Sequence, residues 1–251
     1  MIDALKTIIR KINIKLKLRK FNKFKFKEND SDFLYVKDLR EKGLCLDPDF
    51  LSKSDSGKKI INQFNSINQS TLLDIFNENQ NKKSIKSFKS YLTRFFNKQD
   101  LIDFANQDSI LREVRQYFGF EPYIRYISVW LDYSTNDNQP KDTQIFHRDS
   151  DDVHLIKVFF YLNDVNINNG PFQYIKYSHK KSWIDYKNDF LLNKFAGNIF
   201  SCEAKKGTLI LCDTNGYHKG LTLKEKNYRV MLTVNYTSQS PRWGKLEKII
   251  N

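Results

Sequence analysis

The chain has 251 residues, of which 40% are hydrophobic and 14% aromatic, and its formal net charge is +13. This composition excludes a mainly disordered chain, and the low numbers of Pro and Gly exclude collagen-like or linker-type sequence. No run of about 18 apolar residues occurs and the N-terminus has no compact apolar signal region, so we expect neither a membrane span nor secretion. The three cysteines (Cys45, Cys202 and Cys212) have no C-x-x-C spacing, so we expect buried thiols in a reducing cytoplasm rather than disulfides or a zinc ribbon.

Residues 1–27 form a basic arm. They contain ten Lys or Arg residues and one Asp, which accounts for nine of the thirteen net positive charges. Apolar residues recur in the arm first at helical and then at alternating spacing. The arm is therefore either a helix and strand that pack on the body with lysines in water, or an amphipathic segment that binds an anionic surface. A membrane interface is the favoured surface, and nucleic acid is the less favoured one.

Residues 28–122 are expected to be a mainly helical region that packs on the core. The stretch 28–70 predicts irregular structure with short helices, whereas Thr71–Phe118 has mostly helical periodicity. Gly119 and Pro122 mark the end of this region. We expect residues 28–251 to form one domain.

Residues 123–251 change to short β-branched and aromatic runs separated by Asn, Asp and Gly, which predicts strands. The fold class is therefore α+β, with an antiparallel sandwich or barrel and an N-terminal helical wall. The predicted strands are Tyr123–Tyr133, Thr143–Asp149, His154–Leu162, Pro171–Tyr177, Gly207–Cys212 and Tyr228–Tyr236.

The candidate catalytic residues are an H-x-D pair, His147 and Asp149, followed later in the chain by His218 and Arg229. On a strand, residues i and i+2 share a face, so the first pair can reach one ion. Two imidazoles and one carboxylate form the facial ligand set of non-haem iron(II), and an arginine nearby can bind a distal carboxylate bidentately. The alternative is that these are unrelated polar residues on strands.

Specific motifs flank these residues: HRD at 147–149, YLNDV at 161–165, NGPF at 169–172 and SHK at 178–180. With the spaced His218 and Arg229, the stretch of about residues 123–240 resembles the phytanoyl-CoA dioxygenase family of iron(II)- and 2-oxoglutarate-dependent oxygenases. The resemblance implies a double-stranded β-helix (jelly-roll) core with iron on His147, Asp149 and His218. It also implies that Arg229 pairs with the distal carboxylate of 2-oxoglutarate, and that Gln144 makes a polar contact to this cosubstrate.

The activity implied by the resemblance uses iron(II), 2-oxoglutarate and O2 to hydroxylate a C–H bond of a small-molecule or lipid- or sugar-linked substrate, with release of succinate and CO2. Related halogenases have a small residue at the position of Asp149, so its carboxylate favours hydroxylation over chlorination. Lys157 shares a strand face with Phe159 and Tyr161, and either points into the barrel toward a carboxylate or forms a salt bridge at the rim. Gly220 departs from the family, which often has a hydroxyl residue there.

Other functions stay open at this point. One alternative is a non-catalytic jelly-roll binding module that has kept the four residues, and another is a membrane- or nucleic-acid-associated protein that uses the basic arm. His154 is expected to be an ordinary polar position and His179 to order its loop. Neither the identity of the substrate nor the oligomeric state follows from the sequence.

Overall fold

The computed structural model describes residue 12 and residues 33–80, 89–134, 140, 142–149, 152–180 and 196–238. The predictions for the basic arm of residues 1–27 thus lie outside the described residues, apart from the single position Ile12. No helix in these ranges is both long and apolar enough to cross a membrane.

Residues 33–118 are mostly helical, as predicted. The side chain of Ser54 accepts a hydrogen bond from the Gly57 N–H at the start of the helix Asp55–Asn65. The side chain of Asn97 caps the helix Lys98–Asn106 in the same way. Gly119, at φ +75°, ends the last helix where the sequence predicted it. The helices are α2 (Val36–Lys42), α3 (Phe50–Lys53), α4 (Asp55–Asn65), α5 (Gln69–Gln80), α6 (Lys98–Asn106) and α7 (Asp108–Phe118).

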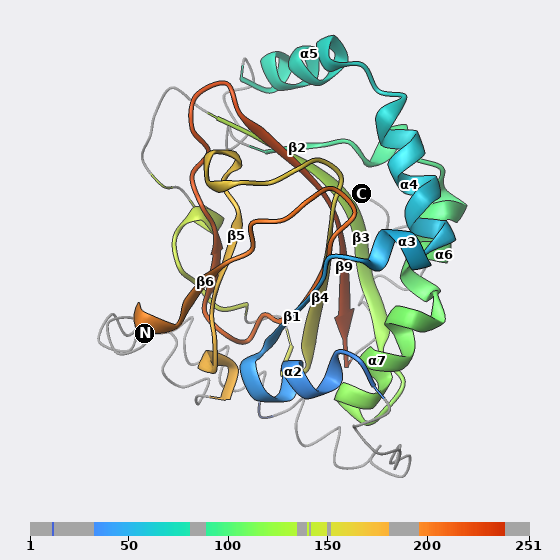
Figure 1. Ribbon diagram of the computed structural model, residues 1–251, viewed down its shortest axis with the longest axis vertical. Coiled ribbons are helices and arrows are strands. Elements are labelled where there is room, and N and C mark those ends of the chain that lie inside the picture. Colours follow the sequence, from blue (N-terminus) through green and yellow to red (C-terminus); the bar gives the residue numbers. More distant parts are fainter. Residues whose placement is uncertain are drawn as a thin grey trace.

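Two antiparallel sheets form the rest of the described structure. The large sheet has the strand order β1-β7-β4-β9-β3-β2, and the small sheet has the order β6-β5-β8. Helices α4, α6 and α7 lie along one side of the large sheet, and the small sheet lies on its other side (Figure 1). The strands are β1 (Leu44–Asp47), β2 (Lys89–Tyr91), β3 (Tyr123–Tyr133), β4 (Leu155–Tyr161), β5 (Phe172–Ile175), β6 (Ile199–Ser201), β7 (Leu209–Asp213), β8 (His218–Gly220) and β9 (Tyr228–Thr237).

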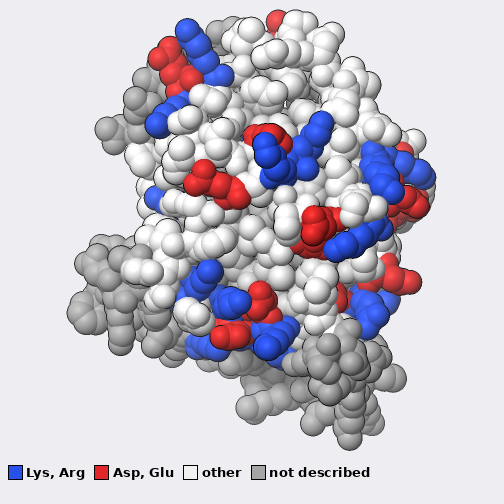
Figure 2. Space-filling view, in the orientation of Figure 1, with Lys and Arg blue, Asp and Glu red and all other residues white. Residues whose placement is uncertain are grey.

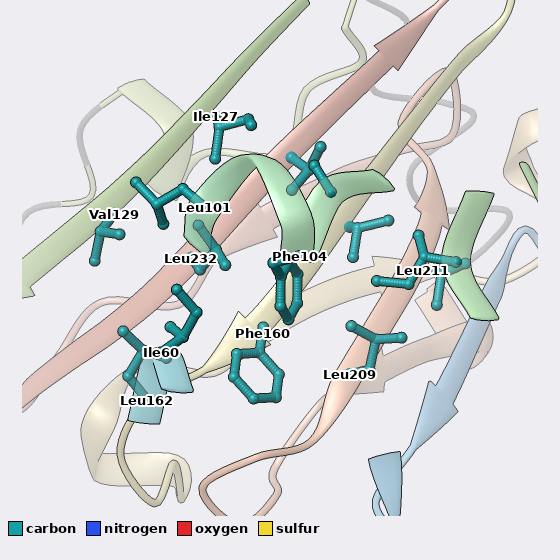
Figure 3. Packing of buried hydrophobic residues seen from close by; sticks show 14 of the residues in the cluster. Ile60, Leu101, Phe104, Ile127, Val129, Phe160, Leu162, Leu209, Leu211 and Leu232 are labelled. Atoms are coloured by element: carbon teal, nitrogen blue, oxygen red, sulfur yellow. The ribbon is translucent and has the colours of Figure 1, made fainter. Parts of the chain in front are cut away.

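The large sheet buries a different apolar cluster on each face. On the helical side, Phe104 of α6 contacts Phe160 of β4 with ring centroids 5.1 Å apart. Figure 3 shows these two rings beside Leu101, Ile127, Val129 and Leu232. On the other side, Phe159 of β4 packs on Phe172 of β5 between the two sheets. Since successive residues of a strand face opposite sides of the sheet, β4 contributes side chains to both clusters. The α+β class is confirmed.

One predicted strand is wrong. Thr143–Asp149 begins in a 3₁₀ helix, η3 (Asp142–Gln144), and then forms only a single bridge, between His147 and His218. The partner β8 is three residues long, so it offers the segment little backbone to pair with. The other five predicted runs form strands within a few residues of the expected bounds.

Four strands were not predicted. β1 and β2 lie in the region expected to be helical or irregular, yet they pair with β7 and β3 in the large sheet. At four and three residues they are too short for an alternating pattern to be recognised. β6 and β8, equally short, were missed for the same reason. The N-terminal region therefore supplies edge strands to the sheet besides its helical wall.

Candidate active site

Backbone pairing between a loop and a short strand assembles the predicted triad. The His147 N–H donates to the His218 carbonyl at 3.0 Å, and the His218 N–H donates back to the His147 carbonyl at 2.9 Å. Two residues further on, the Asp149 N–H donates to the carbonyl of Thr214, in the loop between β7 and β8, at 2.9 Å. These bonds hold the segment with His147 and Asp149 against the segment with Thr214 and His218, although the two segments are far apart in sequence.

The ligand atoms of His147, Asp149 and His218 all lie within 4.8 Å of one another. Nε2 of His147 is 4.0 Å from Asp149 Oδ1, and Nε2 of His218 is 3.7 Å from Asp149 Oδ2. The Nδ1 atoms lie 2.8 Å and 2.9 Å from the carbonyls of Ile145 and Gly216. A carbonyl only accepts, so each Nδ1 carries the proton and each Nε2 is the ring nitrogen with a lone pair that can bind a metal ion. Two imidazole nitrogens and one carboxylate are the donor set that suits iron(II) with open positions.

Lys157 lies inside this cluster rather than at the rim. Its ammonium is 2.7 Å from Asp149 Oδ2. Burial alone would raise the pKa of Asp149, but the charge of Lys157 and its hydrogen bond to the carboxylate outweigh this effect and hold the pKa below its usual value. Burial lowers the pKa of His218 to about 3, although the Asp149 carboxylate opposes the effect. At neutral pH the site therefore holds an ionised carboxylate and a neutral His218, the protonation states that a metal ion requires.

Arg229, the predicted cosubstrate residue, forms a buried ion pair with Asp132. The two residues are directly opposite in the β3–β9 register, and Arg229 Nε and Nη2 lie 3.1 Å and 2.5 Å from Asp132 Oδ2. Nη1 donates to the carbonyl of Gly170. A guanidinium has five N–H groups, so these three bonds leave two for a ligand. A Cβ on Gly220 would stand 2.9 Å from Arg229 Nη2, so the glycine found in place of the family's hydroxyl residue leaves room for the guanidinium.

A cavity of about 170 Å³ between the two sheets joins the triad to Arg229. Lys219, beside the triad in sequence, has its ammonium 4.6 Å from the centre of the Phe146 ring, and partial burial lowers its pKa. Trp130 of β3 packs against Tyr91 with ring centroids 4.0 Å apart. The cavity is lined by Tyr126, Trp130, Thr143, His147, Lys157, Phe159, Phe172, His218, Lys219, Gly220, Arg229, Met231 and Thr233.

The structure brings five of the six predicted site residues together: the triad, Lys157 and Arg229. Gln144 is buried on η3 but does not line the cavity, whereas its neighbour Thr143 does. Its contact to a cosubstrate stays a prediction.

The remaining histidines lie elsewhere. The His154 ring packs on Phe118 and Phe120, and Nε2 of His179 lies 3.2 Å from the Arg40 carbonyl. All three cysteines are free and buried, as expected.

Asp132 and Lys219 are the site residues that sequence reasoning missed. A signal for Asp132 existed, because Asp is depleted in strand interiors and this one stands inside an apolar run at two-residue spacing from Trp130. Lys219 gave no signal beyond its place next to His218.

Comparison with solved structures shows a shared fold. EctD from S. alaskensis with bound Fe is 15% identical, with 87% of this chain and 84% of that chain covered and a TM-score of 0.61. AviO1 from Streptomyces viridochromogenes Tue57 is 11% identical, with 82% and 94% covered and a TM-score of 0.57. The epimerase SnoN from nogalamycin biosynthesis, in complex with Fe3+ and alpha ketoglutarate, is 11% identical, with 80% and 81% covered and a TM-score of 0.56. This likeness confirms the predicted double-stranded β-helix core.

No curated protein matches the sequence. The family model for phytanoyl-CoA dioxygenase matches residues 39–230, which is most of the chain and includes every member of the triad as well as Arg229. The residues at the site have the donor types that iron(II) takes, in a cavity that also reaches an arginine. The chain belongs to the phytanoyl-CoA dioxygenase family, and it is an iron- and 2-oxoglutarate-dependent oxygenase.

Proposed function

We propose that this oxygenase hydroxylates a C–H bond of a small-molecule substrate and that His147, Asp149 and His218 hold its iron(II). The observation that supports this most directly is that the three ligand atoms lie within 4.8 Å of one another while the Nδ1 atom of each histidine is bonded to a backbone carbonyl. Iron(II) with O2 and 2-oxoglutarate supplies the oxidation, with release of succinate and CO2. The protein positions the metal ion, the cosubstrate and the substrate relative to one another.

Each of the charged residues has a defined task in this proposal. Asp149 stays ionised because Lys157 stabilises its charge. Its carboxylate takes the position that a small residue leaves open in related halogenases. This carboxylate therefore favours hydroxylation over chlorination. The two remaining N–H groups of Arg229 receive the distal carboxylate of 2-oxoglutarate, with Lys157 as a second cation in the same cavity. The aromatic rings of Phe159 and Phe172 keep water from the space between.

The test is an anaerobic titration of the metal-free protein with iron(II) and 2-oxoglutarate, followed by the weak visible charge-transfer band of a chelated keto acid. We expect the band in the wild type, its loss in Asp149→Ala and its appearance only at higher 2-oxoglutarate in Arg229→Ala. Asp164→Asn, a change in an exposed carboxylate, serves as the control that keeps the band. A folded wild type without the band would favour the non-catalytic binding module instead.

The substrate is proposed only as a small molecule. EctD has been solved with 5-hydroxyectoine and SnoN with nogalamycin RO, and these ligands differ too much to be carried over. Succinate formation with candidate compounds is the assay that identifies it.

Binding of the basic arm to an anionic membrane surface is proposed from the sequence alone. On the face seen in Figure 2, Lys and Arg lie interspersed with Asp and Glu, so the described body does not present one basic patch there. Any attraction to anionic vesicles should therefore depend on residues 1–27. Removing these residues and finding unchanged vesicle binding would refute the proposal.

A further inference from the structure

On the cavity face of the large sheet, three strand residues bury polar atoms that have no hydrogen-bond partner among the described residues. These atoms are the hydroxyls of Ser128 and Thr233 and both amide atoms of Asn235, in residues that are 1%, 2% and 0% exposed. Buried polar groups in proteins are nearly always paired, so several orphans in one place need an explanation. A bound ligand that supplies the missing hydrogen-bond partners is such an explanation.

The three residues form one polar area on the cavity side of the large sheet. Ser128 of β3 is directly opposite Thr233 of β9, and Asn235 is opposite Tyr126 on one side and Lys157 on the other. Thr233, Tyr126 and Lys157 line the cavity. The alternating neighbours in these strands, among them Ile127, Val129 and Val234, belong to the apolar cluster on the other face. The polar side chains therefore lie on the cavity face of the sheet, with Thr233 in the cavity wall and the other two beside it, where apolar residues of the same size would have packed without an unpaired group.

The donors and acceptors on these side chains determine which groups of a ligand can form hydrogen bonds with them. Hydroxyl and carboxamide groups both donate and accept hydrogen bonds, whereas a carboxylate only accepts and an ammonium only donates. A ligand hydroxyl also donates and accepts, so it can pair with every one of the unpaired atoms. The cavity of about 170 Å³ also has to hold 2-oxoglutarate, so the enclosed part of the substrate is small.

The charges in the site with iron(II) and 2-oxoglutarate bound indicate the charge that the substrate should carry. Arg229 is compensated by Asp132 and Lys157 by Asp149, and a 2-oxoglutarate dianion compensates iron(II). Lys219 is left over: it lines the cavity, and no carboxylate of the described residues lies near its ammonium. One positive charge therefore remains for the substrate to meet.

We propose that Ser128, Thr233 and Asn235 form a hydrogen-bonding subsite for the hydroxyl groups of the primary substrate and that Lys219 binds its single negative charge. The substrate class is then a small polyhydroxylated monoanion, such as a sugar acid. This inference rests on the proposed function for the charge balance, whereas the unpaired polar atoms are observed in the metal-free protein.

The first experiment measures the melting temperature of the metal-free protein. An unpaired buried hydroxyl destabilises the fold, so Thr233→Val and Asn235→Leu should raise the melting temperature. Thr208→Val is the matched control: Thr208 is a fully buried threonine with an unpaired hydroxyl that does not line the cavity, and the change should raise the melting temperature as well. A lower melting temperature in both Thr233→Val and Asn235→Leu would mean that these groups are already satisfied in solution, and the subsite would be refuted.

The second experiment measures binding by calorimetry to protein loaded with zinc(II) and N-oxalylglycine, which hold the site without turnover. The probes are gluconate, hexanoate, which lacks the hydroxyls, and sorbitol, which lacks the charge. We expect gluconate to bind about tenfold more tightly than either, the effect of about one net hydrogen bond or ion contact. Thr233→Val should abolish the preference over hexanoate, Lys219→Met should abolish the preference over sorbitol, and Thr208→Val should abolish neither.

Equal binding of gluconate and hexanoate, or no binding of gluconate, would overturn the proposal. The charge-transfer titration of the wild type separates this failure from failure of the proposed function, because it depends on the triad and Arg229 and not on the subsite. If that band is absent, the melting temperatures of Thr233→Val and Asn235→Leu still decide whether the subsite is vacant.

Discussion

Removal of Asp132 tests whether Arg229, the residue proposed to bind the cosubstrate, is held by a buried charge. The side chains of Arg229 and Asp132 are 4% and 0% exposed, and Asp132→Ala would leave the guanidinium buried without its counter-charge. Breaking a buried ion pair in this way costs about 3–5 kcal/mol. For a chain of this size, that loss corresponds to a fall of roughly 6–20 °C in melting temperature. Asp132→Asn, which keeps a hydrogen-bond acceptor, should lie between the wild type and Asp132→Ala.

The assay is urea unfolding of both single variants, Asp132→Ala and Arg229→Met, and of the double variant. Because the double variant leaves no unpaired charge, it should lose less stability than the two single variants added together. Lys205→Ala is the control: Lys205 Nζ and Asp164 Oδ2 form an ion pair as well, 2.9 Å apart, but their side chains are 85% and 57% exposed, so the loss should stay below about 1 kcal/mol.

Two results would refute this reasoning. A loss in Asp132→Ala no larger than in Lys205→Ala would show that the buried pair contributes no more than a surface pair. Strict additivity of the two single variants would show that Asp132 and Arg229 do not interact in solution. In either case Asp132 would not hold Arg229 in place for a ligand carboxylate.

Further predictions concern the metal, the cosubstrate and pH. Lys157→Met leaves Asp149 without a counter-charge until a metal binds, so manganese(II) should raise the melting temperature of this variant more than that of the wild type, and an equal rise would contradict the argument. Gly220→Ala places a Cβ 2.9 Å from Arg229 Nη2, so the 2-oxoglutarate needed for the charge-transfer band should increase about tenfold while iron binding is unchanged. Burial lowers the pKa of His218 to about 3. As the pH falls below about 6.5, the unfolded chain binds a proton that the folded chain does not. The metal-free protein should therefore lose up to about 1.4 kcal/mol per pH unit until the pH approaches the folded-state pKa. His218→Gln should flatten this slope in urea unfolding, and an unchanged slope would show that His218 is not its source.

The sequence predicted the fold class because the elements that define it are long. β3, β9 and α7 have ten or eleven residues each, which is enough for a periodicity of two or 3.6 to stand out. β1, β2 and β8 have three or four residues, and their pairing depends on neighbours that are distant in sequence. No local pattern distinguishes such strands from loops.

The triad was predictable for a different reason. His147 and Asp149 lie within one motif, and the flanking motifs located His218 and Arg229 through the family resemblance. The argument that placed the first two on one strand was wrong, since they are held in a loop by backbone bonds to His218 and Thr214. The residues that the structure brings together therefore came from the motif and not from the predicted local structure.

The partner of Arg229 could not be predicted, because it depends on strand register. Asp132 meets Arg229 only through the β3–β9 pairing, which also sets Ser128 against Thr233 and Tyr126 beside Asn235. A slip of one residue would turn every one of these side chains to the helical face of the sheet, where the apolar cluster lies. The register changes at a bulge between Ile124 and Tyr126, before the strand reaches the cavity. One alignment of two strands therefore fixes the apolar core, the ion pair of Arg229 and the unpaired polar area together. For this reason the proposed cosubstrate and substrate sites share one face of the sheet.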